Sequence, residues 1–314
     1  MPKVHRSKGS TPSEALLASL CEQTFLDLWS YPNPYKAPGK ELCDLLVVCG
    51  DDVILFSEKT IAFPDSGDEH QDWRRWFKRA VINSTAQLRS AERAIQSAKA
   101  GVYTDNRAKH RLLVPLPDAT RRRLHRVVVA NGAAERCRRH YGGGTGSLRI
   151  TSSIPLDTRD KNELAGSVMP FSIGDLEPSG SFVHVFDSFN LPVVLNELDT
   201  ITDFVRYLGE KERLFRSGKA VLADGEEDLL AYYLQTIGDD HEHTFFGGHL
   251  RDGEQLDVFI LDGEWWSSMS ADPQYVAKRS PTRSATSGTT SFDDSPSTRF
   301  AERAQNLAPP KPTR

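Results

Sequence analysis

Charged side chains stand at the ends of two short apolar runs, 42–49 and 53–57, near the beginning of the chain. Asp44 lies at the start of the first run, and Glu58 and Lys59 follow the second. A turn-forming Gly-Asp-Asp separates the runs, which predict a β-hairpin with strands buried on both faces. Antiparallel pairing would then bring Asp44 and Lys59 to one end of the hairpin. Charged groups beside buried strands are costly unless they are paired, and Mg²⁺ is one partner that carboxylates bind.

Two predicted helices flank this hairpin. The first covers 13–30, with Ser13 as a candidate cap and apolar residues recurring at helical spacing. Glu14 extends this apolar stripe toward the N-terminus of the helix. The proline-rich segment 31–39 cannot continue the helix and predicts an irregular connection. The second helix runs from about 73 to 99 and has one apolar face and basic residues on its other faces.

Further strands at 112–116 and 127–130 complete the order helix, strand, strand, helix, strand. This order predicts an α/β fold class with a compact unit over 13–150. A glycine-rich loop at 142–146 lacks the lysine and Ser/Thr of a phosphate-binding loop, so we interpret it as a linker. The other predicted parts are a flexible N-terminus at 1–12, an acidic α+β unit at 151–270 with strands at 182–186, 193–195 and 258–261 and helices at 201–215 and 229–237, and a disordered tail at 271–314.

The composition excludes several classes of protein. The 314 residues are 38% hydrophobic, which excludes bulk disorder, and no apolar run approaches the roughly 18 residues of a membrane span. The four cysteines do not make a disulfide framework. These features predict a soluble, cytoplasmic protein. We interpret His241, His243 and His249 as exposed loop residues rather than as a zinc site.

The charge of the chain is unevenly distributed. Residues 73–140 hold 17 basic and 4 acidic side chains, a net of +13, within a chain whose net charge is −4. A surface of one sign attracts a polyanion, and phosphate contacts supply most non-specific affinity for nucleic acid. The alternative is that these cations pair with the acidic half of the chain.

With these elements in order, the segment 13–130 resembles the PD-(D/E)xK nuclease superfamily, whose members have a restriction-endonuclease-like core. The likeness rests on an Asp at the start of one buried strand, a Lys at the end of the next, and the order of the surrounding elements. It implies phosphodiester hydrolysis of nucleic acid, DNA favoured, with Mg²⁺ or Mn²⁺ as cofactor. By position, Asp44 would bind the metal, Lys59 would orient or activate the attacking water, and Glu14 matches a first-helix glutamate near the metal.

One position departs from the pattern of this family. Two residues before Lys59, where an acidic residue is usual, the chain has Ser57. Glu58 is the adjacent acid, but alternation along a strand directs its side chain to the opposite face unless the strand end is distorted. Three options follow: Glu58 turns inward after a bulge, Glu41 or Glu14 replaces the missing acid, or the site is inactive.

The resemblance and the charge distribution together define the predicted site. The predicted catalytic residues are Asp44, Glu58, Lys59 and Glu14, and the predicted metal ligands are Asp44, Glu58 and Glu14. The predicted nucleic-acid-binding residues are Arg74, Arg75, Lys78, Arg79, Gln87, Arg89, Arg93, Arg121, Arg122 and Arg123, of which Gln87 and Arg93 match substrate-holding positions on the long helix of the family.

The leading hypothesis is a metal-dependent nuclease that serves in defence or DNA maintenance. Its expected partners are nucleic acid and either a second copy of the chain or a defence-system component, with no membrane. The alternative is an inactive nuclease-like module that binds nucleic acid or a partner protein, and a third option is an interaction protein whose basic helix docks on its own acidic half. The runs 25–35, 39–44 and 198–204 also resemble a group of bacterial proteins, a likeness that implies no mechanism.

Overall fold

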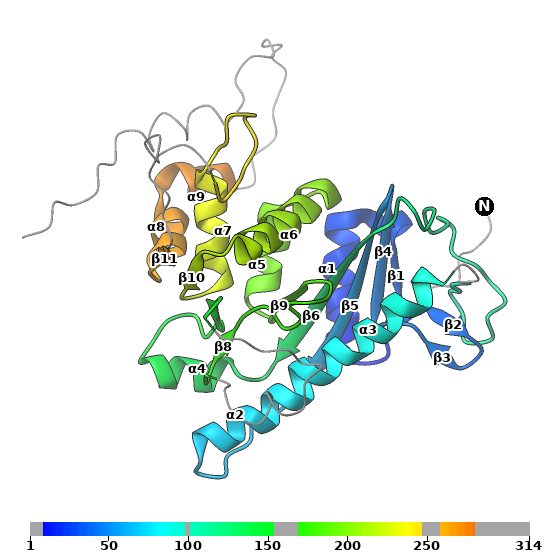
Figure 1. Cartoon of the computed structure of the whole chain (residues 1–314), viewed down its shortest axis with the longest axis horizontal. Coiled ribbons are helices and arrows are strands. Elements are labelled where there is room, and N and C mark those ends of the chain that lie inside the picture. Colours follow the sequence, from blue (N-terminus) through cyan, green and yellow to red (C-terminus); the bar gives the residue numbers. More distant parts are fainter. Residues whose placement is uncertain (1–8, 98–100, 154–168, 247–257, 280–314) are drawn as a thin grey trace, which may run out of the picture.

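The computed structural model describes residues 9–97, 101–153, 169–246 and 258–279, and within them the protein is of the mixed α/β class (Figure 1). The helices are α1 (Pro12–Trp29), α2 (Glu69–Phe77), the π-helical turn η1 (Lys78–Ile82), α3 (Asn83–Gln96), α4 (Ala134–Tyr141), α5 (Asn190–Glu197), α6 (Ile201–Arg216), α7 (Glu226–Gln235), α8 (Trp265–Ala271) and α9 (Pro273–Arg279). The strands are β1 (Ser30–Pro32), β2 (Tyr35–Ala37), β3 (Lys40–Glu41), β4 (Leu45–Cys49), β5 (Asp52–Thr60), β6 (Arg123–Asn131), β7 (Arg149–Thr151), β8 (Ser172–Ile173), β9 (Val183–Phe186), β10 (Ala220–Ala223) and β11 (Val258–Leu261). None of the helices in these ranges is long and apolar enough to cross a membrane.

The larger sheet has five strands in the order β1-β4-β5-β6-β9. The predicted hairpin is confirmed: β4 and β5 pair antiparallel, with Leu45 opposite Phe56 and Cys49 opposite Asp52. Gly50 has a φ of 58° in the turn, a left-handed conformation that glycine adopts without steric cost. β6 runs parallel to β5, and β9 runs parallel to β6. Helices cover both faces of β5, which explains why its apolar residues form a continuous run rather than alternate.

The two flanking helices lie on opposite faces of this sheet (Figure 1). α1 packs against β4 and β5, and α3 packs against β5 and β6. The apolar stripe predicted for α1 is buried at Leu17, Cys21 and Phe25. The stripe ends there because Leu26 leaves helical geometry with a φ of 63°, and Leu28 is therefore exposed.

The caps of these helices correct two predictions. The cap of α1 is Thr11 rather than Ser13, since Pro12 takes the first helical position and the Thr11 hydroxyl accepts the Glu14 N–H. The long basic helix begins at Glu69 rather than Trp73, because the Asp68 carboxylate caps it by accepting the Gln71 N–H. From there α2, η1 and α3 form one continuous rod. A π-helical turn inside a long helix is often found at functional sites.

The second half of the chain contributes to both larger sheets. β9 lies beyond the predicted boundary at 150 and yet pairs with β6, while β7 belongs to the four-stranded sheet β11-β10-β7-β8. Buried apolar residues from both halves form one continuous core.

Four predictions for local structure are wrong. The segment 31–39, expected to be an irregular connection, contains β2 and most of β1, which pairs antiparallel with β4. Residues 193–195 lie in α5, at whose start the Asp187 carboxylate accepts the N–H groups of Phe189 and Asn190. Residues 112–116 form no strand. Pro115 lies among them, and a proline has no backbone N–H to donate to a neighbouring strand. The predicted disordered tail 271–314 includes the last residue of α8 and all of α9, and residues 280–314 lie outside the described residues.

Candidate functional site

Asp44 and Lys59 meet at one end of the β4–β5 hairpin, as predicted. The Lys59 Nζ lies 3.8 Å from the Asp44 Oδ2, and 5% of the Asp44 side chain is exposed against 35% for Lys59. The Asp44 N–H donates to the Phe56 carbonyl at 3.1 Å, so strand pairing continues one residue beyond β4. The Glu58 N–H donates to the Asp44 Oδ2 at 2.6 Å. The backbone of β5 therefore fixes the Asp44 carboxylate beside the lysine.

Ser57 and Gln87 contact the same carboxylate from two elements. The Ser57 hydroxyl donates to the Asp44 Oδ2 at 3.2 Å, and the Gln87 amide donates to the Asp44 Oδ1 at 3.3 Å. Ser57 and Gln87 are also hydrogen-bonded to each other at 3.4 Å. Gln87 belongs to α3, so this part of the site lies between the sheet and the long helix. Of the predicted residues, the structure brings Asp44, Lys59 and Gln87 together.

Glu58 lies on the other face of the sheet. Its carboxylate accepts hydrogen bonds from Ser13 at 2.8 Å, Thr60 at 2.6 Å and Asn131 at 2.8 Å. The pairing of β5 with β6 runs without a shift in register from Asp52 to Thr60, so the strand has no bulge that would turn Glu58 inward. The structure therefore does not bring the Glu58 carboxylate to Asp44, and its metal-binding role remains a prediction without support from the geometry.

Asn33 connects two glutamates near Asp44. Its amide nitrogen donates to the Glu14 Oε2 at 3.1 Å and to the Glu41 Oε1 at 2.6 Å, and its backbone N–H donates to the Asp44 carbonyl at 2.9 Å. Asn33 is buried and has a φ of 46°, a conformation that Asn tolerates better than most residues. The sequence pattern missed Asn33, because an asparagine between two prolines is typical of an ordinary turn.

Burial raises the pKa of Asp44, and the nearby charge of Glu14 raises it further, although Lys59 and the hydrogen bonds from Glu58 and Ser57 partly offset this. Burial also raises the pKa of Glu41, with added repulsion from Asp44 and Glu14 against the stabilising effects of Asn33 and Lys59. Three carboxylates thus repel one another at this end of the hairpin, and Lys59 does not fully compensate them.

The donor set at this end suits one kind of metal site. Among the residues that the structure describes, no group of three His, Cys, Asp or Glu side chains is arranged to hold a metal ion by itself. Mg²⁺ usually keeps several waters and is bound through one or two carboxylates together with substrate phosphates. The residues therefore fit a hydrated ion on Asp44 with one neighbouring glutamate, and they do not fit a closed cage of protein ligands.

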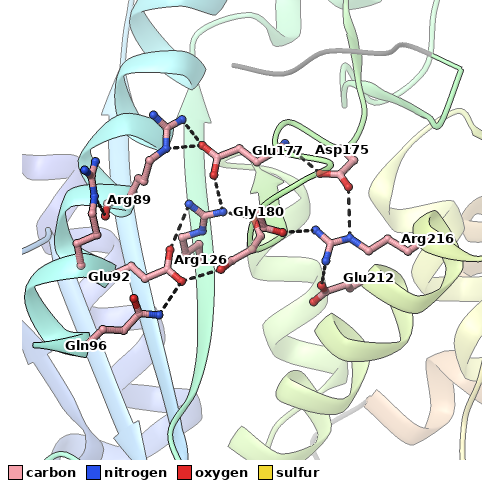
Figure 2. Close-up of polar contacts among 11 residues, drawn as sticks. Arg89, Glu92, Gln96, Arg126, Asp175, Glu177, Gly180, Glu212 and Arg216 are labelled. Atoms are coloured by element: carbon pink, nitrogen blue, oxygen red, sulfur yellow. Dashed lines mark hydrogen bonds and ion pairs between the residues drawn. The ribbon is translucent and has the colours of Figure 1, made fainter. Parts of the chain in front are cut away.

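Several of the predicted nucleic-acid-binding cations are engaged inside the protein. Arg89 donates to the Glu177 Oε1 at 2.7 Å, and Glu177 also accepts from the buried Arg126 at 2.8 Å (Figure 2). This network joins α3 and β6 to the segment that precedes β9. Four other predicted cations have internal contacts: Arg75 with Asp72, Arg121 with Asp51, Arg123 with Asp52, and Arg122 with the backbone carbonyls of Ile95 and Pro117. The alternative of internal pairing thus holds for part of the basic segment.

The remaining predicted cations face solvent. Arg74, Lys78 and Arg79 on α2 and η1 are exposed and have no carboxylate contact within the described part of the chain. Arg93 is exposed and donates to the Arg89 carbonyl at 3.3 Å. These residues precede or follow Gln87 on the same continuous rod.

Comparison of the chain with family models, curated proteins and solved structures gives no match. The fold and the geometry of the site are therefore the basis for assigning a function.

Proposed function

We propose that this protein is a Mg²⁺- or Mn²⁺-dependent nuclease with a restriction-endonuclease-like core, which hydrolyses phosphodiester bonds in nucleic acid, DNA favoured. The carrying observation is the 3.8 Å contact between Lys59 and Asp44 at the adjoining ends of β4 and β5. The sequence of elements supports it: α1, an Asp-bearing strand, a Lys-bearing strand, a long helix on the opposite face from α1, and the parallel strand β6.

Each residue of the site has a role in this proposal. Asp44, with Glu14 or Glu41, would hold the metal ion, which supplies Lewis-acid stabilisation of the phosphate and activation of bound water. The Lys59 ammonium is half-exposed and can orient the attacking water by hydrogen bonding. Gln87 donates a hydrogen bond to the Asp44 carboxylate from α3 and so restricts the orientation of that carboxylate. Arg74, Lys78 and Arg79 supply exposed cations for backbone phosphates.

The test is cleavage of plasmid and single-stranded DNA by the purified full chain with Mg²⁺ or Mn²⁺, repeated with EDTA. We expect metal-dependent nicking that falls by about 10³-fold in Lys59→Ala, because water activation is lost. Lys219→Ala removes a partly exposed lysine whose Nζ lies over Phe246, near β10 in the other sheet, and is the matched control. Cleavage that persists in EDTA, or that Lys59→Ala leaves unchanged, contradicts the proposal.

One observation favours a second candidate, a binding module without catalytic activity. Ser57 occupies the position where the related pattern has an acid, and the Glu58 carboxylate is held on the opposite face. For this candidate, the wild-type chain binds DNA with steep salt dependence and leaves it intact at every metal concentration.

A further inference from the structure

We propose that the small ribbon formed by β2, β3 and the segment 101–112 is a preformed arm that binds the phosphate backbone of the nucleic acid. We call this surface the basic ribbon. The inference rests on the proposed function for its ligand, and it adds a substrate-binding surface that the continuous helix of α2, η1 and α3 does not contain.

Backbone hydrogen bonds hold the basic ribbon in one conformation. β2 pairs antiparallel with β3. Tyr35 and Tyr103 exchange N–H to carbonyl bonds of 2.8 and 2.9 Å, and the Gly39 N–H donates to the Asn106 carbonyl at 2.7 Å. The Asp105 carboxylate accepts the N–H groups of Arg107, Lys109 and His110 at 3.0, 3.0 and 2.6 Å, which fixes the loop. A surface already ordered in this way loses little conformational entropy when it binds.

The basic ribbon begins and ends at the candidate site. β2 follows directly after Asn33, and β3 ends at Glu41, whose carboxylate is bonded to Asn33. Asp44 is three residues further along the chain. Figure 1 shows β2 and β3 standing out beside β1, the edge strand of the five-stranded sheet. A phosphate chain that reaches Asp44 and Lys59 therefore has the basic ribbon on one side.

Cations dominate the surface of the basic ribbon. They are Lys36, Lys40, Arg107, Lys109 and Arg111, and all except the half-buried Lys36 are exposed. None of them has a carboxylate contact within the described ranges. The two acids of the ribbon are already engaged, Glu41 with Asn33 and Asp105 with the three N–H groups. Five cations against two acids leave the basic ribbon a formal charge of +3, and its cations lack the carboxylate contacts that Arg121 and Arg123 have.

A polyphosphate backbone is the partner that this surface fits best. Exposed lysine and arginine side chains on a two-stranded ribbon can follow a strand of phosphates, and binding releases the counterions of the nucleic acid. An acidic protein surface is the competing partner, and it would bind without the strong salt dependence that counterion release produces.

The test compares two triple variants of the full chain by fluorescence anisotropy with a short labelled DNA duplex in EDTA. The ribbon variant carries Lys40→Gln, Arg107→Gln and Lys109→Gln. The control variant carries Arg139→Gln, Arg213→Gln and Lys219→Gln, which removes the same charge from positions outside the ribbon. We expect the ribbon variant to bind about ten-fold more weakly and to lower the slope of log affinity against log salt by about 2 to 3, with no change in the control.

Single variants keep the test independent of any folding defect in the triple variant. Lys40→Gln and Lys109→Gln should each lower the slope by about 0.9. A ribbon variant with wild-type affinity and slope overturns the inference, even where the wild-type chain cleaves DNA. Conversely, a wild-type chain that binds DNA through the ribbon without cleaving it overturns the proposed nuclease activity and leaves this inference intact.

Discussion

The acidic side chains at the two ends of the β4–β5 hairpin have opposite electrostatic surroundings. At the turn, Asp51 pairs with Arg121 at 2.9 Å, and Asp52 pairs with Arg123 at 2.6 Å and with His125 at 3.0 Å. Burial alone would raise the pKa of Asp52, but the hydrogen bonds and charges of Arg123 and His125 outweigh it and hold the pKa at about 2. At the other end, burial and like charges raise the pKa of Asp44 instead.

Under the proposed function, this difference separates a structural use of charge at the turn from a functional use around Asp44. Both acids at the turn contact cations, Arg121 in the loop before β6 and Arg123 in β6, and the lowered pKa of Asp52 means that the fold gains from its ionisation. Asp44, Glu14 and Glu41 repel one another beside Lys59, and the raised pKa values of Asp44 and Glu41 mean that the fold loses from the ionisation of these two. Groups whose pKa is shifted by burial and by neighbouring charges are candidates for function. A divalent cation bound beside these carboxylates would offset their mutual repulsion.

The largest expected change comes from restoring the missing acid. Ser57→Asp places a carboxylate beside Asp44, on the face that α3 covers. We expect Mn²⁺ affinity to rise about ten-fold, since a further carboxylate oxygen joins the site, and the metal-free protein to become less stable through repulsion. Titration calorimetry and thermal melting measure the two effects, with Ser57→Asn as the uncharged control. Unchanged Mn²⁺ affinity would show that the metal does not bind on this face.

Removing Asp52, the paired acid at the turn, should have a smaller effect, which is a loss of stability of the fold. Asp52→Asn loses the ion pair with Arg123 and changes the hydrogen bond with His125, and we expect a loss of about 1 kcal/mol in unfolding free energy at neutral pH, after solvent screening. Because the folded-state pKa is about 2 against the usual 3.8, this stability is present above pH 3.8 and is lost as the pH falls toward 2. Urea unfolding at several pH values measures it, with the exposed Asp239→Asn as control. A loss independent of pH in this window would contradict the assignment.

The smallest effect is a gain in stability at the candidate site. A raised pKa means that the folded state favours neutral Asp44, so stability falls as the pH rises through the folded-state pKa. Asp44→Asn removes this penalty, and we expect the melting temperature at neutral pH to rise by about 2 °C, with the gain disappearing in acid. Scanning calorimetry decides the sign. A clear drop would mean that the ion pair with Lys59 stabilises the fold.

Local sequence patterns predicted the parts of this site that depend on strand geometry. Two apolar runs and a turn were enough to place Asp44 beside Lys59, and alternation along the strand indicated that Glu58 would face away. Contacts between distant segments were beyond such patterns. Glu177 is 88 positions from Arg89, so nothing near Arg89 in the chain indicated that Arg89 pairs with an acid inside the protein. The link from Asn33 to Glu14 and Glu41 likewise depends on the three-dimensional path of a turn.

The same limit explains the errors in secondary structure. Residues 193–195 have the β-branched composition of a strand, but Asp187 accepts the N–H groups at the start of a helix there, and tertiary packing buries Val194 within it. The ribbon of β2 and β3 escaped prediction because its strands are too short to show a period.

The most direct test of the account is calorimetric titration of Mn²⁺ into the full chain and into the variants Asp44→Asn and Asp52→Asn, without nucleic acid. We predict that the wild-type chain and Asp52→Asn bind one ion with similar affinity and that Asp44→Asn loses at least about ten-fold in affinity. Equal binding by all three proteins, or no binding by the wild-type chain, would contradict the claim that Asp44 and its neighbouring acids bind a divalent cation.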